Sequence, residues 1–205
     1  MTSATAKLEA FERWMQANDV WMDPRLGFKQ LQREGRGNGV VALADLAQGT
    51  VVSRIPKKAV LSWRNSHCSA AIEAFKLRGG LAVVAALMYE WVQGEASPWF
   101  GYLAVLPPRE NIPLFWTQDQ QSLLGGTDLE AALDRSRKHL QEDYKTIKKL
   151  CRAHPTVFPV EKHTYEHFVN MGSLVASRAF HVDKYHGQAM VPLAGTDEVN
   201  KSRSV

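Results

Sequence analysis

Cysteine is scarce in this sequence: the 205 residues include two, Cys68 and Cys151. Two cysteines are too few for a disulfide scaffold, and they do not show the paired spacing of a zinc site. A reducing, intracellular compartment is therefore expected, either the nucleus or the cytoplasm or both.

Long apolar runs are also missing. The longest, Leu81–Met88, is too short to cross a bilayer. Residues 1–7 contain no apolar stretch of the kind that begins a signal peptide. We therefore expect neither a membrane span nor secretion.

Charge of one sign does not dominate. The chain has 25 basic and 21 acidic residues, a net charge of +4, and the two signs are interspersed. The densest basic cluster runs from Lys145 to Arg152 on a predicted helix, where a solvated helix face is the simpler interpretation. Nucleic-acid binding through this face is a weak alternative, because no nucleic-acid motif or interleaved aromatic residue accompanies the cluster.

A metal site is not predicted. His163 and His167 stand four residues apart on a predicted helix, a spacing that zinc sites use. No third ligand accompanies them, and Glu161 and Glu166 are out of place for the matching metalloprotease motif. We therefore expect these histidines to lie at the surface or to cap the helix.

Hydrophobic periodicity predicts the secondary structure. Helices are expected over residues 4–17, 71–93, 117–124, 127–151 and 161–176, and short strands over residues 28–33, 39–43 and 50–55. Thr127 and Asp128 are expected to accept amide protons at the start of their helix. The order is a helix, a small antiparallel meander, several helices and a return to an extended segment. This order predicts an α+β domain whose sheet is interrupted by a helical insertion.

Three glycines at alternate positions stand between the first two predicted strands: Gly35, Gly37 and Gly39. Glycine permits positive φ and lets the backbone approach a ligand closely. The spacing fits neither the dinucleotide-binding fingerprint nor a phosphate loop. Taken alone, the glycines indicate a hairpin turn.

Four motifs in a fixed order change that interpretation. A glycine-rich turn and its strands occupy residues 35–56, and a Ser-x-Trp-x-x-Tyr-Leu-x-x-Leu-Pro run occupies residues 97–107. Ile-Pro-Leu-Phe-Trp and Leu-Leu-Gly-Gly-Thr follow at residues 112–116 and 123–127, and Ser-Arg-Ala-Phe occupies residues 177–180. Together they resemble the SET-domain protein-lysine methyltransferases of the Rubisco large-subunit methyltransferase-like class, which includes ribosomal-protein and other non-histone lysine methyltransferases. The resemblance implies small antiparallel sheets of the SET-domain type, interrupted by a helical insertion.

The resemblance implies transfer of a methyl group from S-adenosyl-L-methionine to a lysine side chain of a protein substrate, without a metal. By motif position, Arg36, Gly37 and Asn38 would contact the cofactor through their backbone. Arg178 would bind the cofactor's carboxylate or shape the substrate entrance, and Phe180 would line the lysine channel. The alternative for Arg178 is a surface ion pair, and the alternative for Phe180 is packing in the core.

The resemblance also divides the chain. The first SET half is expected over residues 1–97, the helical insertion over 98–172, the start of the second SET half over 173–194 and a divergent tail over 195–205. The family's Asn-His pair and its later tyrosine have no counterpart, so the catalytic residue is unknown and the C-terminal part is expected to be missing. Asn200 imitates the pair poorly, and Tyr185 comes too early and is expected in a turn at residues 183–186. The competing hypothesis is a non-catalytic SET remnant that acts as a protein-binding module.

Overall fold

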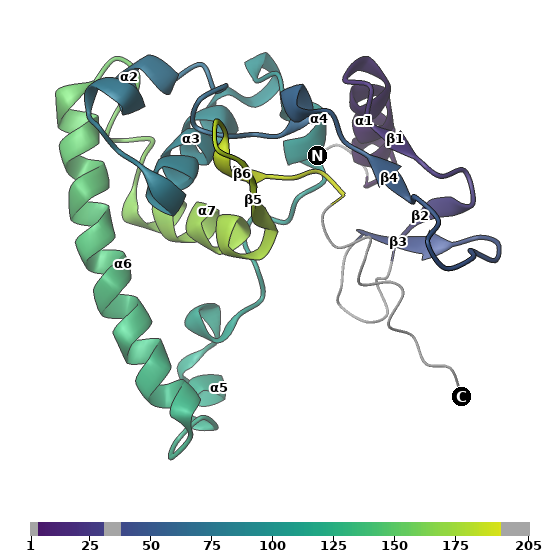
Figure 1. Ribbon diagram of the computed structural model, residues 1–205. Coiled ribbons are helices and arrows are strands. Elements are labelled where there is room, and N and C mark those ends of the chain that lie inside the picture. The colour runs from purple at the N-terminus through teal and green to yellow at the C-terminus, as the bar shows by residue number, and fades with distance from the viewer. Residues whose placement is uncertain (1–3, 31–37, 194–205) are drawn as a thin grey trace.

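The computed structural model describes residues 4–30 and 38–193 (Figure 1). Its helices are α1 (Ala4–Ala17), α2 (Ser69–Ala74), α3 (Gly79–Gln93), α4 (Phe100–Ala104), α5 (Gln118–Ser122), α6 (Asp128–Ala153) and α7 (Tyr165–Arg178). Its strands are β1 (Trp21–Met22), β2 (Leu26–Gln30), β3 (Asn38–Ala42), β4 (Ser53–Arg54), β5 (Ala179–Asp183) and β6 (Gly187–Met190). The predicted α+β class is confirmed.

The strands form three antiparallel pairs, β1 with β4, β2 with β3 and β5 with β6. The β2–β3 hairpin agrees with the predicted meander, and Phe28 stands opposite Val40 in it. The meander does not continue into β4, however. The Asp23 N–H donates to the Val52 carbonyl at 2.9 Å, so β4 joins β1 instead. An isolated antiparallel bridge between Leu61 and Met190 joins β6 to the segment that follows β4.

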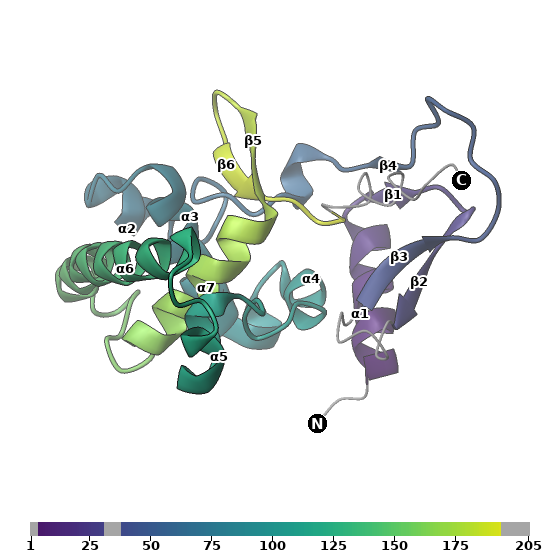
Figure 2. The ribbon, with the colours of Figure 1, turned by 90° about the horizontal axis from the view of Figure 1, so that it is seen from below.

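Helix α3 is the centre of the core. Residues 82–88 are all buried, so the helix is covered on every side, as expected for a helix that is apolar all round. Helices α2, α4 and α7 and strand β6 pack against it. Figures 1 and 2 show α1 and the strands β1–β4 on one side of the molecule, with α4 between them and the other helices.

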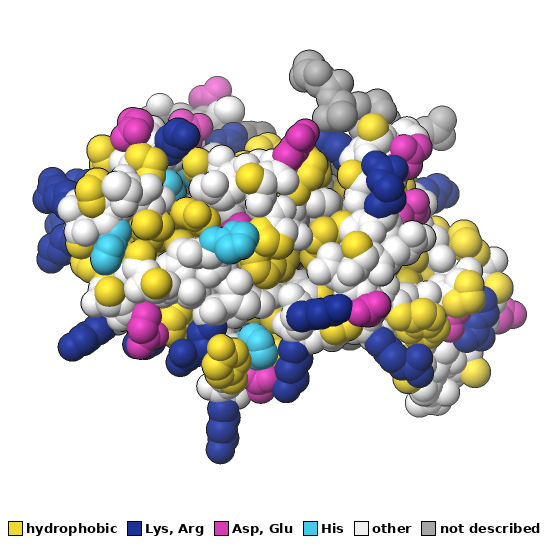
Figure 3. All heavy atoms as spheres, turned by 90° about the horizontal axis from the view of Figure 1, so that it is seen from above, with side chains coloured by type: hydrophobic (Ala, Val, Ile, Leu, Met, Phe, Trp, Pro, Cys, Tyr) yellow, Lys and Arg dark blue, Asp and Glu magenta, His cyan; other side chains and the backbone are white. Residues whose placement is uncertain are grey.

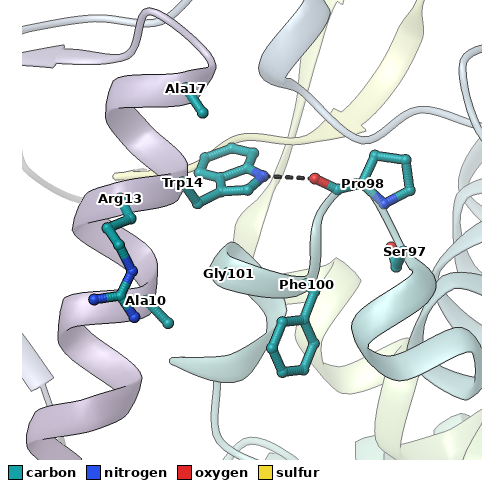
Figure 4. A pocket seen from close by; sticks show the side chains of 8 residues that line it. All are labelled: Ala10, Arg13, Trp14, Ala17, Ser97, Pro98, Phe100 and Gly101. Carbon is teal, nitrogen blue, oxygen red and sulfur yellow. Dashed lines mark hydrogen bonds between the residues drawn. The ribbon is translucent and has the colours of Figure 1, made fainter.

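Helix α1 has the predicted bounds, because its apolar residues recur at helical spacing and become its buried face: Phe11, Trp14 and Met15. This face packs on α4. The Trp14 indole N–H donates to the Pro98 carbonyl at 2.6 Å, which ties the two elements together (Figure 4). A largely apolar pocket opens along this seam, lined by Ala10, Arg13, Trp14, Ala17, Ser97, Pro98, Phe100 and Gly101.

The helix predicted over residues 71–93 is in fact two helices, α2 and α3. Lys76, between these helices, and Gly79, the first residue of α3, adopt positive φ, 59° and 66°. A left-handed residue cannot continue a right-handed helix, so the chain turns before α3 begins. Gly79 takes this conformation without steric cost.

Helix α6 contains the predicted residues 127–151 almost entirely and ends two residues later, at Ala153. Its buried residues, Ile147, Leu150 and Cys151, lie near the C-terminus, so the N-terminal half projects beyond the core beside α5 (Figure 1). The prediction that the Thr127 side chain accepts an amide proton at the start of α6 is wrong. Thr127 precedes the helix, but its hydroxyl donates to the Leu124 carbonyl at 2.6 Å because the 122–127 turn offers that acceptor. Among residues 4–30 and 38–193, none of the helices combines the length and apolarity of a membrane crossing.

Candidate functional site

Arg178 is the last residue of α7 and stands directly before β5. Its guanidinium forms an ion pair with the carboxylate of Glu110, which lies in the connection that follows α4. The two side chains are 23% and 21% exposed, but the paired atoms, Arg178 Nη1 and Glu110 Oε1, are themselves buried. The Glu110 N–H donates to the Ser173 hydroxyl at 3.1 Å, which holds the connection against α7. The ion pair considered as the alternative for Arg178 is therefore present.

The Tyr102 hydroxyl is buried and has no hydrogen-bond partner among the described residues. Its ring lies 5.9 Å from the Trp14 ring and 6.2 Å from the Phe11 ring, centre to centre. Burial raises the pKa of Tyr102 well above its ordinary value, and the positive charge of Arg178 opposes that rise. The site therefore pairs a neutral phenol with a nearby guanidinium. A buried polar atom without a partner marks a place where a water or a ligand group is expected.

The turn between β5 and β6 is organised by Asp183. Its carboxylate accepts hydrogen bonds from the backbone N–H groups of Tyr185 and His186, at 2.9 and 2.7 Å. The Lys57 ammonium lies 2.6 Å from the same carboxylate. The expectation that Tyr185 belongs to this turn is confirmed, and the turn holds Tyr185 at the surface, 62% exposed.

Acid is expected to weaken this turn. The hydrogen bond from Lys57, followed by those from the turn, holds the pKa of Asp183 well below its usual range. A carboxyl with a lowered pKa stabilises the fold above its unfolded pKa of about 3.9, and this contribution is lost as pH falls through the folded value. Asp183→Asn should therefore lower Tm at neutral pH, and the difference from the wild type should shrink below about pH 4. Thermal melts across this range measure it, and a difference that stays constant with pH would contradict the assignment.

Comparison with known proteins identifies the architecture around this site. No protein-family model matches the chain. The N-lysine methyltransferase SETD6 of Bos taurus is 27% identical over 186 residues, covering 85% of this chain and 40% of the relative. Ribosomal lysine N-methyltransferase 3 of Saccharomyces cerevisiae is 26% identical over 184 residues, covering 77% and 33%. The solved structure of Rubisco LSMT bound to AdoMet matches with a TM-score of 0.78 at 22% identity, over 95% of this chain and 44% of that one.

The fold is that of the SET-domain lysine methyltransferases. The LSMT SET domain bound to MeLysine and AdoHcy gives a TM-score of 0.76 at 21% identity, again over 95% of this chain. The family resemblance found in the motifs is thereby confirmed. The chain spans about 40% of the length of the curated relatives first matched.

Of the three residues predicted to contact the cofactor through their backbone, the structure describes one. Arg36 and Gly37 lie outside the described residues, and Asn38 begins β3, where it stands opposite Gln30. Their contacts with the cofactor stay predictions. Phe180 lies on β5 and is 50% exposed, so packing in the core is wrong as an alternative for this residue. Among the described residues β6 is the one strand paired with β5, and the role of Phe180 in a lysine channel stays a prediction.

Two residues of the site were given no role from the sequence, Glu110 and Tyr102. Tyr102 stands inside the Ser97–Pro107 motif, so the motif itself was the signal that could have identified it. Glu110 carries no such signal. Its partner Arg178 lies on another element far along the chain, and the pairing exists only once α7 packs beside the connection after α4.

The expectation for the histidines is wrong for His163. This residue is 1% exposed, its Nδ1 lies 2.9 Å from the Pro159 carbonyl, and its ring packs edge-on against Phe158. The chain folds back after Pro159 and buries the ring, while Thr164 caps α7 by accepting the His167 N–H at 3.2 Å. In the part of the chain that the structure describes, no three His, Cys, Asp or Glu side chains gather to hold a metal ion.

Proposed function

We propose that this chain binds S-adenosyl-L-methionine and transfers its methyl group to a lysine side chain of a protein. The observation that carries the proposal is the Ser177–Phe180 motif at the junction of α7 and β5, in a chain whose fold matches Rubisco LSMT bound to AdoMet. The matched curated proteins are named for lysine methylation, which supports the same reaction. A nuclear or cytoplasmic location is part of the proposal, supported by the scarcity of cysteine.

When bound, S-adenosyl-L-methionine supplies an electrophilic methyl group on a sulfonium. A lysine amine attacks this group only in its neutral form, and free lysine has a pKa of about 10.4. A narrow apolar channel lowers that pKa by desolvation, and the exposed ring of Phe180 is the described group that we assign to it. The remaining work is alignment and electrostatics, which requires neither a covalent intermediate nor a metal.

Arg178 and Tyr102 fit the anionic end of such a cofactor. A guanidinium presents two parallel N–H donors that match a carboxylate, and the Arg178 side chain is 23% exposed although its Nη1 atom is buried against Glu110. The Tyr102 hydroxyl supplies a further donor that has no partner among the described residues. The backbone of residues 36–38 completes the proposed site by motif position.

Glu110→Gln is expected to raise the affinity for S-adenosyl-L-methionine about tenfold, which corresponds to about 1.4 kcal/mol. In the wild type the cofactor's carboxylate must displace the Glu110 carboxylate from Arg178, and in the variant it meets no competing charge. Arg178→Ala should lower the affinity by about tenfold or more, because a charge-assisted contact is lost. Calorimetric titration measures both changes.

Two controls make this result specific. Methylthioadenosine keeps the adenosine and the methyl-bearing sulfur, as a neutral thioether, but lacks the amino-acid end with its carboxylate, so neither substitution should change its affinity. Glu142→Gln removes an exposed carboxylate that pairs with Lys145 at 2.7 Å on α6, and it should leave cofactor binding unchanged. If Glu142→Gln raises the cofactor affinity as much as Glu110→Gln does, the increase comes from the change in net charge, and the assignment of Glu110 is wrong.

Methyl transfer itself is tested with radiolabelled cofactor and lysine-containing peptides. A folded chain that gives no heat with S-adenosyl-L-methionine would contradict the proposal and favour the alternative of a non-catalytic SET remnant. Binding without transfer would confine the proposal to cofactor recognition.

A further inference from the structure

Four side chains form a ladder on the surface beside the β5–β6 turn: Arg78, Trp63, Arg64 and Tyr185. The Arg64 guanidinium carbon lies 4.3 Å from the centre of the Trp63 ring and 5.3 Å from that of Tyr185. Arg78 covers Trp63 as well, at 4.7 Å. Trp63 is buried, so it is a fixed platform on which the guanidinium of Arg64 can lie. Stacking of this kind holds a guanidinium in place while its N–H edges stay available.

The charges around the ladder are unevenly neutralised. Arg78 pairs with Glu73 at 2.6 Å, and Lys57 pairs with Asp183 at 2.6 Å. Arg64 is half-buried, and among residues 4–30 and 38–193 no carboxylate or carbonyl is bonded to its guanidinium. Figure 3 shows basic side chains beside hydrophobic and histidine side chains on the face seen from above. Arg64 is therefore a positioned cation with hydrogen-bonding capacity to spare.

The ladder is rigid at its outer end too. Tyr185 is 62% exposed, yet its backbone is fixed because Asp183 accepts its N–H and is itself held by Lys57. The strand that leads into this turn also carries Phe180, the residue assigned to the lysine channel. A peptide that places a lysine at Phe180 would thus have its flanking residues within reach of the hairpin that bears Tyr185.

We infer that Arg64, stacked between Trp63 and Tyr185, binds acidic side chains that flank the target lysine in the protein substrate. This inference rests on the proposed function, and it gives the substrate class: a lysine in an acidic segment. A planar, immobilised guanidinium matches a carboxylate through two parallel hydrogen bonds. The net charge of +4 on the chain favours the approach of such a segment.

The test uses fluorescence anisotropy of the 205-residue chain with a labelled peptide that carries one lysine followed by a run of glutamates. Arg64→Ala should weaken binding about tenfold, the loss of one charge-assisted bidentate contact. Arg64→Lys keeps the charge but loses the planar stacking group, so it should also weaken binding severalfold. Arg152→Ala removes the same charge from an exposed position in the last turn of α6 and should leave binding unchanged. The same peptide with glutamines in place of glutamates should bind far more weakly.

Three results would overturn the inference: equal affinity for the glutamate and glutamine peptides, an equal loss in Arg64→Ala and Arg152→Ala, or displacement of the peptide by single-stranded DNA carrying the same charge. A cofactor titration separates this test from that of the proposed function. Arg64-dependent peptide binding by a chain that takes no S-adenosyl-L-methionine would support recognition of acidic segments and contradict the proposed activity. Methylation of both peptides at equal rates would support the activity and overturn the inference.

Discussion

Glu90→Ala is expected to lower the free energy of unfolding by about 3 to 5 kcal/mol. The Glu90 carboxylate is fully buried near the C-terminal end of α3. It accepts hydrogen bonds from the Ser66 hydroxyl at 2.7 Å, the His67 N–H at 3.1 Å and the Ser97 hydroxyl at 2.7 Å. Alanine would leave the two buried serine hydroxyls and the His67 N–H without this acceptor, and each buried donor so left costs about 1 to 3 kcal/mol.

Glu90→Gln is the matched control, because it keeps the length of the side chain and one acceptor oxygen. It should cost about 1 kcal/mol, since the serine hydroxyls can turn to suit the new amide. Urea unfolding measures the free energy of unfolding of both variants, which can be compared if the dependence on urea concentration, m, is the same for both. An alanine variant as stable as the glutamine variant would show that the network contributes little. Through Glu90 this network also joins the loop that follows Arg64 to the turn that begins the Ser97–Pro107 motif.

Gly101→Ala is expected to cost about 3 kcal/mol of stability, at the upper end for overpacking. An added Cβ would lie 2.4 Å from the Cβ of Trp14 and 2.8 Å from the Ala10 carbonyl oxygen. Neither atom can rotate away, so α1 would have to move off α4. Tyr102 follows Gly101 directly and stacks on Trp14, so the same displacement should also weaken cofactor binding next to Arg178.

Gly172→Ala tests whether the effect comes from the close contact and not from the loss of glycine. Gly172 lies inside α7, and a Cβ added there meets nothing within 4 Å. Alanine in a helix interior is more favourable than glycine by up to about 1 kcal/mol, so this variant should be as stable as the wild type or more so. Thermal and urea unfolding measure the stability of Gly101→Ala and Gly172→Ala. An equal loss of stability in both variants would contradict the close-contact argument.

The sequence was sufficient for features that depend on neighbouring residues. The bounds of α1 follow from the spacing of Phe11, Trp14 and Met15 alone, since one face of a helix must be apolar to pack. The Ser97–Pro107 motif was identified by its resemblance to the family's sequence, and the structure shows which contacts its residues make. Ser97 binds Glu90, Trp99 donates to the Ala59 carbonyl at 3.3 Å, and Gly101 admits Trp14.

What the sequence did not predict depends on segments that meet only after folding. Arg178 was identified by its motif, but its pairing with Glu110 requires α7 to pack beside the connection after α4. His163 was expected outside the core because its own neighbours are polar, whereas the ring is buried against Phe158. The break between α2 and α3 had a local signal in Gly79 and Gly80. The apolar run that follows these glycines continues the helical periodicity, and the prediction therefore joined the two helices.

The projecting end of α6 offers a place for a covalent label. A helix of 26 residues is about 39 Å long at 1.5 Å per residue, and its buried residues lie at the opposite end. Gly125 and Gly126, which precede it, are exposed, and exposed loop tips tolerate insertion. Figure 1 shows this end far from β5 and β6. A dye or a surface tether placed there would follow the tumbling of the whole molecule while leaving Arg178 and Arg64 untouched.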